Sequence, residues 1–227
     1  MEPAAIALVL QLGDSSFPSG AFTASWGLES LSRAGLVTDE ADVHVLMLDQ
    51  LRHRWATFDR VVAHRVAAVL GGGGGVPEVL ALDALVDAMS LPPAQRAASR
   101  AAGAAFLRSA ADALGGTVAA RDRAVRRDGV ALHLAVSHPL VLLDAGVALA
   151  DVEIAGGMQL VQQLASAAVR LGLVGHRAAA RVVTAGRTEL VHLVAAPPED
   201  LEPSQFLPLA EIAMYRHATL PTKVFRC

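Results

Sequence analysis

The stretch that decides the fold class is Asp39–Leu70, which reads DEADVHVLMLDQLRHRWATFDRVVAHRVAAVL. Its large apolar residues recur every three or four positions, and this spacing places side chains on one face of an α-helix. They are Leu48, Leu51, Trp55, Phe58, Val62, Val66 and Val69. The polar side chains that fall largely off this stripe, on the face expected to be solvated, are Arg52, His53, Asp59, Arg60 and His64. The pattern predicts one long amphipathic helix and is compatible with a break near its middle.

The rest of the chain also favours helix over sheet, because aromatic residues make up only 4% and alanine is abundant. Further helices are expected over residues 23–34, 77–90, 93–114, 117–127, 153–173 and 209–219. No segment alternates as a strand does. The pattern predicts an all-α fold, a single domain over residues 1–227 built as a helical bundle of about eight to ten helices.

Glycine and proline mark the expected interruptions. Gly71–Gly75 is expected to form a surface loop, and it lacks the Lys-Ser/Thr that follows a phosphate-binding loop. His138-Pro139 is expected to break an apolar segment. Gly27, expected inside a helix, marks a place where another backbone comes close.

Composition excludes several functional classes. The formal net charge of −3 argues against a nucleic-acid-binding module, which normally carries a basic surface. The single cysteine, Cys227, excludes a disulfide framework. The apolar stretch Gly129–Leu143 is interrupted by histidine and proline and falls short of the roughly 18–20 residues of a membrane span. We expect a soluble, cytoplasmic protein with no nucleic-acid or membrane partner, whose excess apolar surface a protein partner covers.

No residue pattern predicts catalysis or tight metal binding. His53 and His64 lie on one predicted helix about 16 Å apart, too far to share one ion. The serines near the N-terminus lack the Gly-x-Ser-x-Gly motif of a nucleophile elbow. We therefore expect no catalytic residue and no tightly bound cofactor or metal. For Cys227, a metal ligand paired with a histidine and an inert exposed thiol both remain open.

Three segments differ from ordinary helix sequence. The first, Leu10–Glu29, contains a Pro-Ser-Gly turn between two helices. The second surrounds Arg170, the only Asp, Glu, Lys or Arg between Glu153 and Arg177. The third is the C-terminal tail, residues 220–227, in which Pro221 ends a helix and apolar residues follow.

Together these segments resemble the UreF family of urease accessory proteins. The family pattern Leu-x-Gln-Leu, Pro-x-Gly-x-Phe and Ser-x-Gly-Leu-Glu is matched up to Glu29, and a middle helix resembles the family's Arg-x-x-Ser-x-x-x-Gly at Arg96, Ser99 and Gly103. Later motifs are matched at Arg170, Leu171, Gly175, His217 and Phe225. The chain departs from the pattern at Leu173, His176, Ala218, Lys223, Val224 and Cys227.

The resemblance implies an all-helical, non-enzymatic maturation chaperone that tends to form a homodimer. Such proteins bind the accessory protein UreD, also called UreH, recruit the GTPase UreG to apo-urease, regulate GTP turnover, and assist the delivery of nickel, which transits the complex. Positions in and beside these motifs become candidates for the partner interface: Gln11, Asp14, Pro18, Gly20, Ser25, Glu29, Arg170, Gly175, His217, Lys223, Phe225 and Arg226.

Two residues carry specific expectations. Arg170 is expected to be an anchor bonded to carbonyl groups or to a carboxylate. Phe225 is expected to fill an apolar pocket of the partner, with Lys223 and Arg226 at its rim and the tail ordered only in the complex. The alternative for the tail is packing on its own globule. The alternative function is a helical small-ligand carrier or enzyme whose interhelical pocket is anchored by Arg170.

Overall fold

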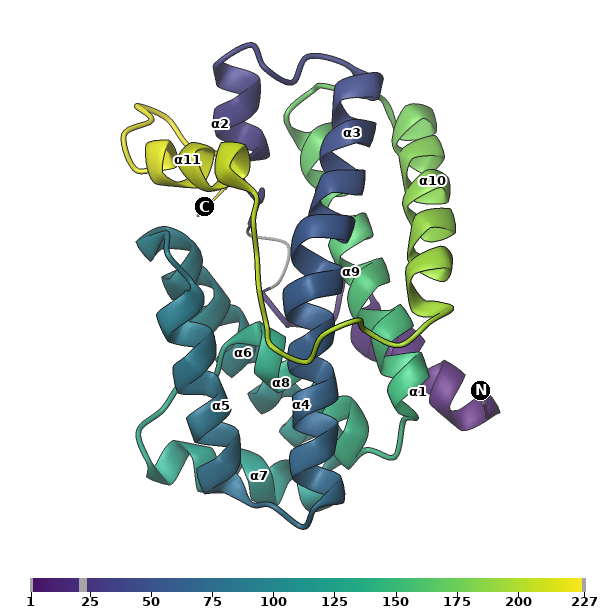
Figure 1. The fold of residues 1–227 in the computed structure, drawn as a ribbon, viewed down its shortest axis with the longest axis vertical. Coiled ribbons are helices and arrows are strands. Elements are labelled where there is room, and N and C mark those ends of the chain that lie inside the picture. Colours follow the sequence, from purple (N-terminus) through teal and green to yellow (C-terminus); the bar gives the residue numbers. More distant parts are fainter. Residues whose placement is uncertain (1, 21–23, 226–227) are drawn as a thin grey trace.

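The computed structural model describes residues 2–20 and 24–225. These residues form helices and turns without a strand, and they contain ten helices if one long composite helix is counted once (Figure 1). The prediction of an all-α fold is confirmed. Over the described ranges, no helix combines the length and the apolar character that crossing a membrane requires.

The predicted long helix is a composite rod. It consists of α3 (Glu40–Gln50), the π-helical segment η2 (Leu51–Asp59) and α4 (Arg60–Gly71). Asp39 caps its start, because the Asp39 carboxylate accepts hydrogen bonds from the backbone N–H groups of Ala41 (2.9 Å) and Asp42 (3.0 Å). The break near the middle is a change of helical type that keeps the rod continuous.

Several of the remaining helices begin or end at the prolines and glycines expected to mark their bounds. Pro77 and Pro93 occupy the first turns of their helices, and Gly71 ends α4, so the glycine run forms the turn before α5. The helices are α1 (Pro3–Gly13), α2 (Leu28–Arg33), α5 (Val76–Met89), α6 (Pro93–Leu114), α7 (Gly116–Arg127), α8 (Leu134–Asp144), α9 (Leu149–Arg170), α10 (His176–Val194) and α11 (Pro208–His217).

Two expectations about local structure are wrong. Gly27 does not lie inside a helix: its φ of 86° is left-handed, and α2 begins only after it. A Cβ at Gly27 would lie 2.9 Å from the carbonyl oxygen of Ala210, so the expected close approach is confirmed. Pro139 does not break its segment but lies buried inside α8, which continues to Asp144 although proline has no backbone N–H to donate.

The buried apolar residues form two clusters. The first core lies among α2, α3, α9, α10 and α11, and the second among α4, α5, α6, α7 and α8. Figure 1 shows these groups as the upper and lower parts of the molecule, with the rod extending through both. The rod contributes Met47 and Trp55 to the first core and Phe58 and Val62 to the second. The rod therefore connects the two cores.

The helix that resembles the family's Arg-x-x-Ser-x-x-x-Gly pattern packs closely against the segment before α8. The Ser99 hydroxyl accepts a hydrogen bond from the backbone N–H of Leu134 (3.2 Å). A Cβ at Gly103 would lie 2.2 Å from the carbonyl oxygen of Leu132, closer than side chains tolerate. The structure thus explains the serine and the glycine by backbone packing.

We predict that Gly103→Ala lowers the free energy of unfolding by about 1–3 kcal/mol, because the added methyl group must push the Leu132 backbone away. The matched control is Gly71→Ala, where a Cβ meets no atom within 4 Å. Its effect should stay below about 1 kcal/mol. Urea denaturation measures both, and equal effects would contradict the packing argument.

Candidate functional site

Two of the three segments singled out in the sequence, Leu10–Glu29 and the tail, meet at a buried carboxylate. Glu29, on α2, is fully buried. Its Oε1 accepts a hydrogen bond from the backbone N–H of Val224 (2.8 Å), and its Oε2 accepts one from the N–H of Phe225 (3.0 Å). The Nε2 atom of His217 lies 3.1 Å from the same Oε2. We call Glu29, His217, Val224 and Phe225 the Glu29 junction.

Local structure explains why Glu29 faces inward. The left-handed backbone of Gly27 starts α2 at Leu28, so Glu29 lies in the first, buried turn. The absence of a side chain at Gly27 lets α11 pack there, at Ala210 and Ala213. The last turn of α11 then carries His217 to the carboxylate. Because a carboxylate only accepts, Nε2 of His217 carries the proton of this bond.

Arg170 and Phe225 lie together beside this junction. The Phe225 side chain is 5% exposed and belongs to the first core. The guanidinium carbon of Arg170, the last residue of α9, lies 4.2 Å from the centre of the Phe225 ring. This is a cation–π contact. Arg170 therefore contacts the tail through the Phe225 ring, a type of partner that the sequence analysis did not expect.

The tail was expected to be ordered only in a complex, and this is wrong for its described residues. Phe225 is buried in the first core of its own chain and does not need a partner to cover it. Lys223 donates a hydrogen bond to the carbonyl of Ala218 (3.0 Å), and Thr222 accepts one from Arg33 (3.3 Å). Glu29 supplies the acceptors that hold the tail. The sequence pattern could not indicate this pairing, because Glu29 lies 195 residues before Val224. Arg226 lies outside the described residues.

The other candidate interface residues lie elsewhere. Gln11 is exposed on α1, and Asp14 follows that helix. Hydrogen bonds from Ser16 lower the pKa of Asp14. The carbonyl of Pro18 accepts a hydrogen bond from Ser109 on α6 (3.1 Å), and Gly20 has a left-handed φ of 67°.

Gly175 and Ser25 complete the set. Gly175 precedes the first residue of α10. Ser25 is fully buried, and its hydroxyl is 3.5 Å from the backbone N–H of Glu29. The structure therefore brings Ser25, His217 and Phe225 to Glu29, with Arg170 on the Phe225 ring and Lys223 beside Val224, and it places the remaining described candidates elsewhere.

Burial and hydrogen bonding act in opposite directions on Glu29. Burial alone raises the pKa of a carboxyl group. The N–H groups of Val224 and Phe225, together with His217, outweigh burial and bring the pKa of Glu29 below its ordinary value. Glu29 is therefore a charged carboxylate that holds the tail.

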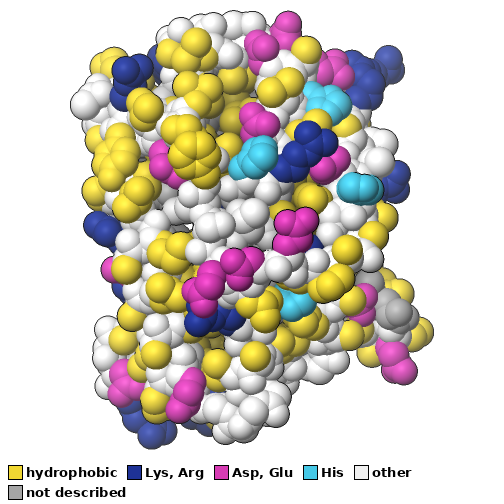
Figure 2. Space-filling model, in the orientation of Figure 1, with side chains coloured by type: hydrophobic (Ala, Val, Ile, Leu, Met, Phe, Trp, Pro, Cys, Tyr) yellow, Lys and Arg dark blue, Asp and Glu magenta, His cyan; other side chains and the backbone are white. Residues whose placement is uncertain are grey.

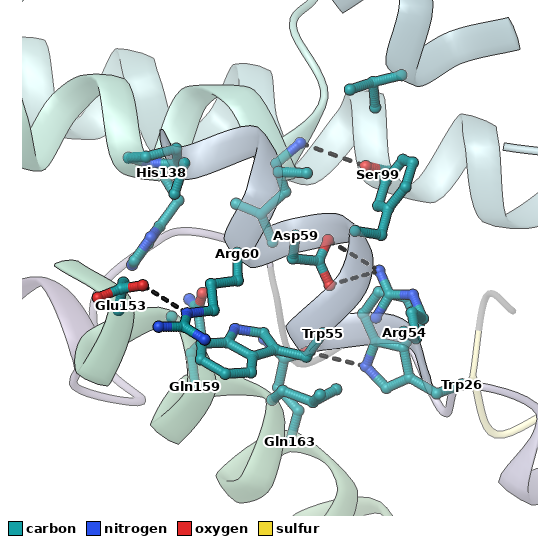
Figure 3. Close-up of a pocket in the computed structure, with 18 of the residues that line it drawn as sticks. Trp26, Arg54, Trp55, Asp59, Arg60, Ser99, His138, Glu153, Gln159 and Gln163 are labelled. Carbon is teal, nitrogen blue, oxygen red and sulfur yellow. Dashed lines mark hydrogen bonds and ion pairs between the residues drawn. The ribbon is translucent and has the colours of Figure 1, made fainter. Parts of the chain in front are cut away.

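A second buried charge cluster was missed by the sequence analysis. Arg60 was expected on a solvated face but is buried, with Nε 2.5 Å from Oε1 of Glu153. It also donates hydrogen bonds to the carbonyls of Leu193 (2.9 Å) and Ala196 (2.6 Å). His64 Nε2 lies 2.8 Å from the same Glu153 oxygen. Figure 3 shows Arg60 directed at Glu153.

The segment that covers Arg60 is the connection between α10 and α11, residues 195–207, which we call the strap. Figure 1 shows it crossing the rod. Its Ser204 and Phe206 N–H groups donate to the carbonyls of Thr57 (2.9 Å) and His53 (3.2 Å) in the π-helical segment. The spacing of apolar residues within the rod could not predict that the strap covers Arg60, because the strap lies far away in the sequence.

The described residues contain no group of three or more His, Cys, Asp and Glu side chains placed to hold a metal ion. Cys227, the other candidate ligand, lies outside the described residues. What the arrangement around Glu29 does provide is a hydrogen-bonded anchor for the C-terminal segment.

Comparison with known proteins agrees with this architecture. The model of the UreF family matches residues 37–187, which extend from the start of the rod into α10. The chain belongs to the UreF family. The resemblance inferred from the sequence motifs is thereby confirmed. Of the residues around Glu29, the family match includes Arg170.

Curated relatives extend the similarity over the whole chain. The urease accessory protein UreF of Azorhizobium caulinodans is 32% identical over 231 residues, covering 99% of this chain and 96% of that protein. The protein of the same name from Xanthobacter autotrophicus is 33% identical, covering 93% of this chain and 86% of that protein. These UreF alignments therefore span nearly the full length of both proteins.

We predict that Glu29→Gln loosens the tail. The amide keeps one acceptor oxygen but replaces the other with a donor, so one tail N–H or His217 loses its acceptor. The backbone amides of Val224 and Phe225 should exchange with deuterium faster, and the free energy of unfolding should fall by about 1–3 kcal/mol.

The control is Glu40→Gln, which removes a carboxylate paired with Arg181 at 2.6 Å on the surface. Its effect should stay below about 1 kcal/mol, with tail exchange unchanged. Tail exchange that is equal in the two variants would contradict the role of Glu29.

A second prediction concerns pH. Because the folded-state pKa of Glu29 lies below the ordinary 4.5, its stabilising contribution is present above pH 4.5 and is lost as the pH falls through the folded value. Between pH 5 and 3, the stability difference between the wild type and Glu29→Gln should shrink as the pH falls, because Glu29 takes up a proton. Urea denaturation across this range measures it, and a difference that grows in acid would show that Glu29 is not held as a carboxylate.

Proposed function

We propose that this chain is a urease accessory protein, a non-enzymatic participant in urease maturation. The observation that carries the proposal is the match to the UreF family over residues 37–187. The full-length similarity to proteins named urease accessory protein UreF supports it. The function thus rests on family membership, and exposed apolar side chains support the proposal for a partner surface made below.

The surface that best fits a partner protein lies on α11 and beside it. Ile212 and Tyr215 on α11 are each 50% exposed. The Tyr215 hydroxyl donates a hydrogen bond to the carbonyl of Leu91 (2.9 Å), which joins the α5–α6 turn to this surface. We call these exposed apolar residues the α11 face: Leu91, Phe206, Leu209, Ile212 and Tyr215. Figure 2 shows hydrophobic side chains gathered over α11 at the upper left.

We propose that the α11 face binds the partner accessory protein UreD, also called UreH. Exposed apolar side chains that lie close together on a surface commonly mark a protein interface. The Glu29 junction connects α11 to α2 through His217, so it holds this face in a defined orientation. The junction is therefore the structural support of the docking surface, and Lys223 and the half-exposed Val224 extend it at one side.

The further steps follow the family resemblance. The complex recruits the GTPase UreG to apo-urease and regulates its GTP turnover, and nickel passes through the complex as cargo. A homodimer in the cytoplasm is the form proposed for the chain. The alternative of a small-ligand carrier loses its support, because Arg170, its proposed anchor, is an exposed side chain stacked on Phe225.

The proposal is tested with Ile212→Asp in cells that express the urease gene cluster. A charge at the centre of the α11 face should reduce co-purification of UreD/UreH by about tenfold and lower the nickel content of urease in proportion. The melting temperature of the isolated protein should not change, because Ile212 is half exposed.

The matched control is Val45→Asp, at a 60% exposed apolar residue of α3. It should leave UreD/UreH binding intact. Normal binding by Ile212→Asp would place the interface elsewhere. Normal nickel content of urease in cells that lack this chain altogether would refute the accessory role itself.

A further inference from the structure

A pocket lined by both polar and apolar side chains lies where the two cores meet, and we call it the cavity. Its volume is about 80 Å³. The first core contributes Trp26, Trp55 and Leu160 to its wall, and the second contributes Phe58, Val86 and Val152. A buried water molecule needs roughly 10–15 Å³ of such space, so the cavity has room for several.

The π-helical segment supplies the charged part of the wall. The Arg54 guanidinium lies 3.8 Å from the centre of the Trp26 ring and 3.2 Å from the Asp59 carboxylate. Burial raises the pKa of Asp59, and the adjacent Arg54 opposes this rise. The Trp26 indole donates to Gln163 (3.1 Å), as Figure 3 shows.

Two polar atoms of this wall have no hydrogen-bond partner among the described residues. They are Nε of Arg54, which is a donor, and Oε1 of Gln95, which is an acceptor. Both side chains line the cavity and are more than nine-tenths buried, at 7% and 5% exposed. Burying a polar group without a hydrogen-bond partner costs free energy, so we expect each of these two atoms to bind a ligand.

The charged side chains on the wall form pairs of opposite sign, so no net charge remains to bind an ion. Arg54 faces Asp59, and Arg60 faces Glu153. His138, the histidine of the wall, is neutral at pH 7 because burial lowers its pKa to about 4. The ligand must therefore be small, uncharged, and able both to donate and to accept hydrogen bonds.

We infer that this cavity is a hydration site, in which bound water molecules accept a hydrogen bond from Arg54 Nε–H and donate one to Gln95 Oε1. The water bridges α6 to the π-helical segment across the boundary of the two cores. It lets polar side chains remain buried between two apolar clusters.

Nuclear magnetic resonance tests the inference on the full-length wild-type protein. In a water-selective ROE experiment, the Nε–H proton of Arg54 should show a cross-peak at the water frequency. Arg121 provides the internal control, because its Nε–H already bonds to the Asp144 carboxylate at 2.9 Å and should show no such peak. The absence of a cross-peak for Arg54 would overturn the inference.

Gln95→Met gives an independent measurement, because it removes the acceptor with little change of volume. The Arg54 cross-peak should weaken at least twofold, while the Arg121 spectrum stays unchanged. An unaltered Arg54 cross-peak would show that its water does not bridge to Gln95. A small organic molecule that co-purifies with the wild type in stoichiometric amount, and is detected by native mass spectrometry, would assign the cavity a different ligand.

Discussion

The buried carboxylate of Glu29 is the constraint on which the upper part of the molecule depends. A charge removed from water is costly unless hydrogen bonds compensate it. Here the compensation comes from His217 on α11 and from two backbone N–H groups of the tail. The chain can bury Glu29 only when α2, α11 and the tail are all in place. One side chain near the N-terminus therefore determines where the C-terminus packs.

The second buried charge pair, Arg60 with Glu153, plays the corresponding role in the middle of the rod. Arg60 joins α4 to α9 and also binds carbonyls at the end of α10 and in the strap. The strap then leads directly into α11. Two charge clusters thus fix both ends of one continuous segment, which consists of the strap, α11 and the tail. This segment carries most of the exposed apolar surface that we assign to a partner.

Much of the helix pattern could be predicted, because its signals are local. Pro93 fits the first turn of α6, and Gly115 tolerates the left-handed φ of 65° that follows its end, so two residues mark the bounds of this helix. The π-helical segment was not specified, since an apolar residue every three or four positions does not distinguish the two helical types. The burial of Arg60 and of Phe225 could not be read from the chain, because each depends on a partner more than 90 residues away. The motifs did identify the residues around Glu29, but as an interface with another protein and not as contacts within this one.

The most direct test of this account is a nuclear Overhauser measurement on the free, wild-type protein. The account requires cross-peaks between the Phe225 ring and the Arg170 side chain, whose guanidinium lies 4.2 Å from the ring centre. It also requires slowly exchanging backbone amides at Val224 and Phe225. A Phe225 ring without contacts to Arg170, together with rapidly exchanging tail amides, would show that the free tail is detached and that Glu29 does not hold it.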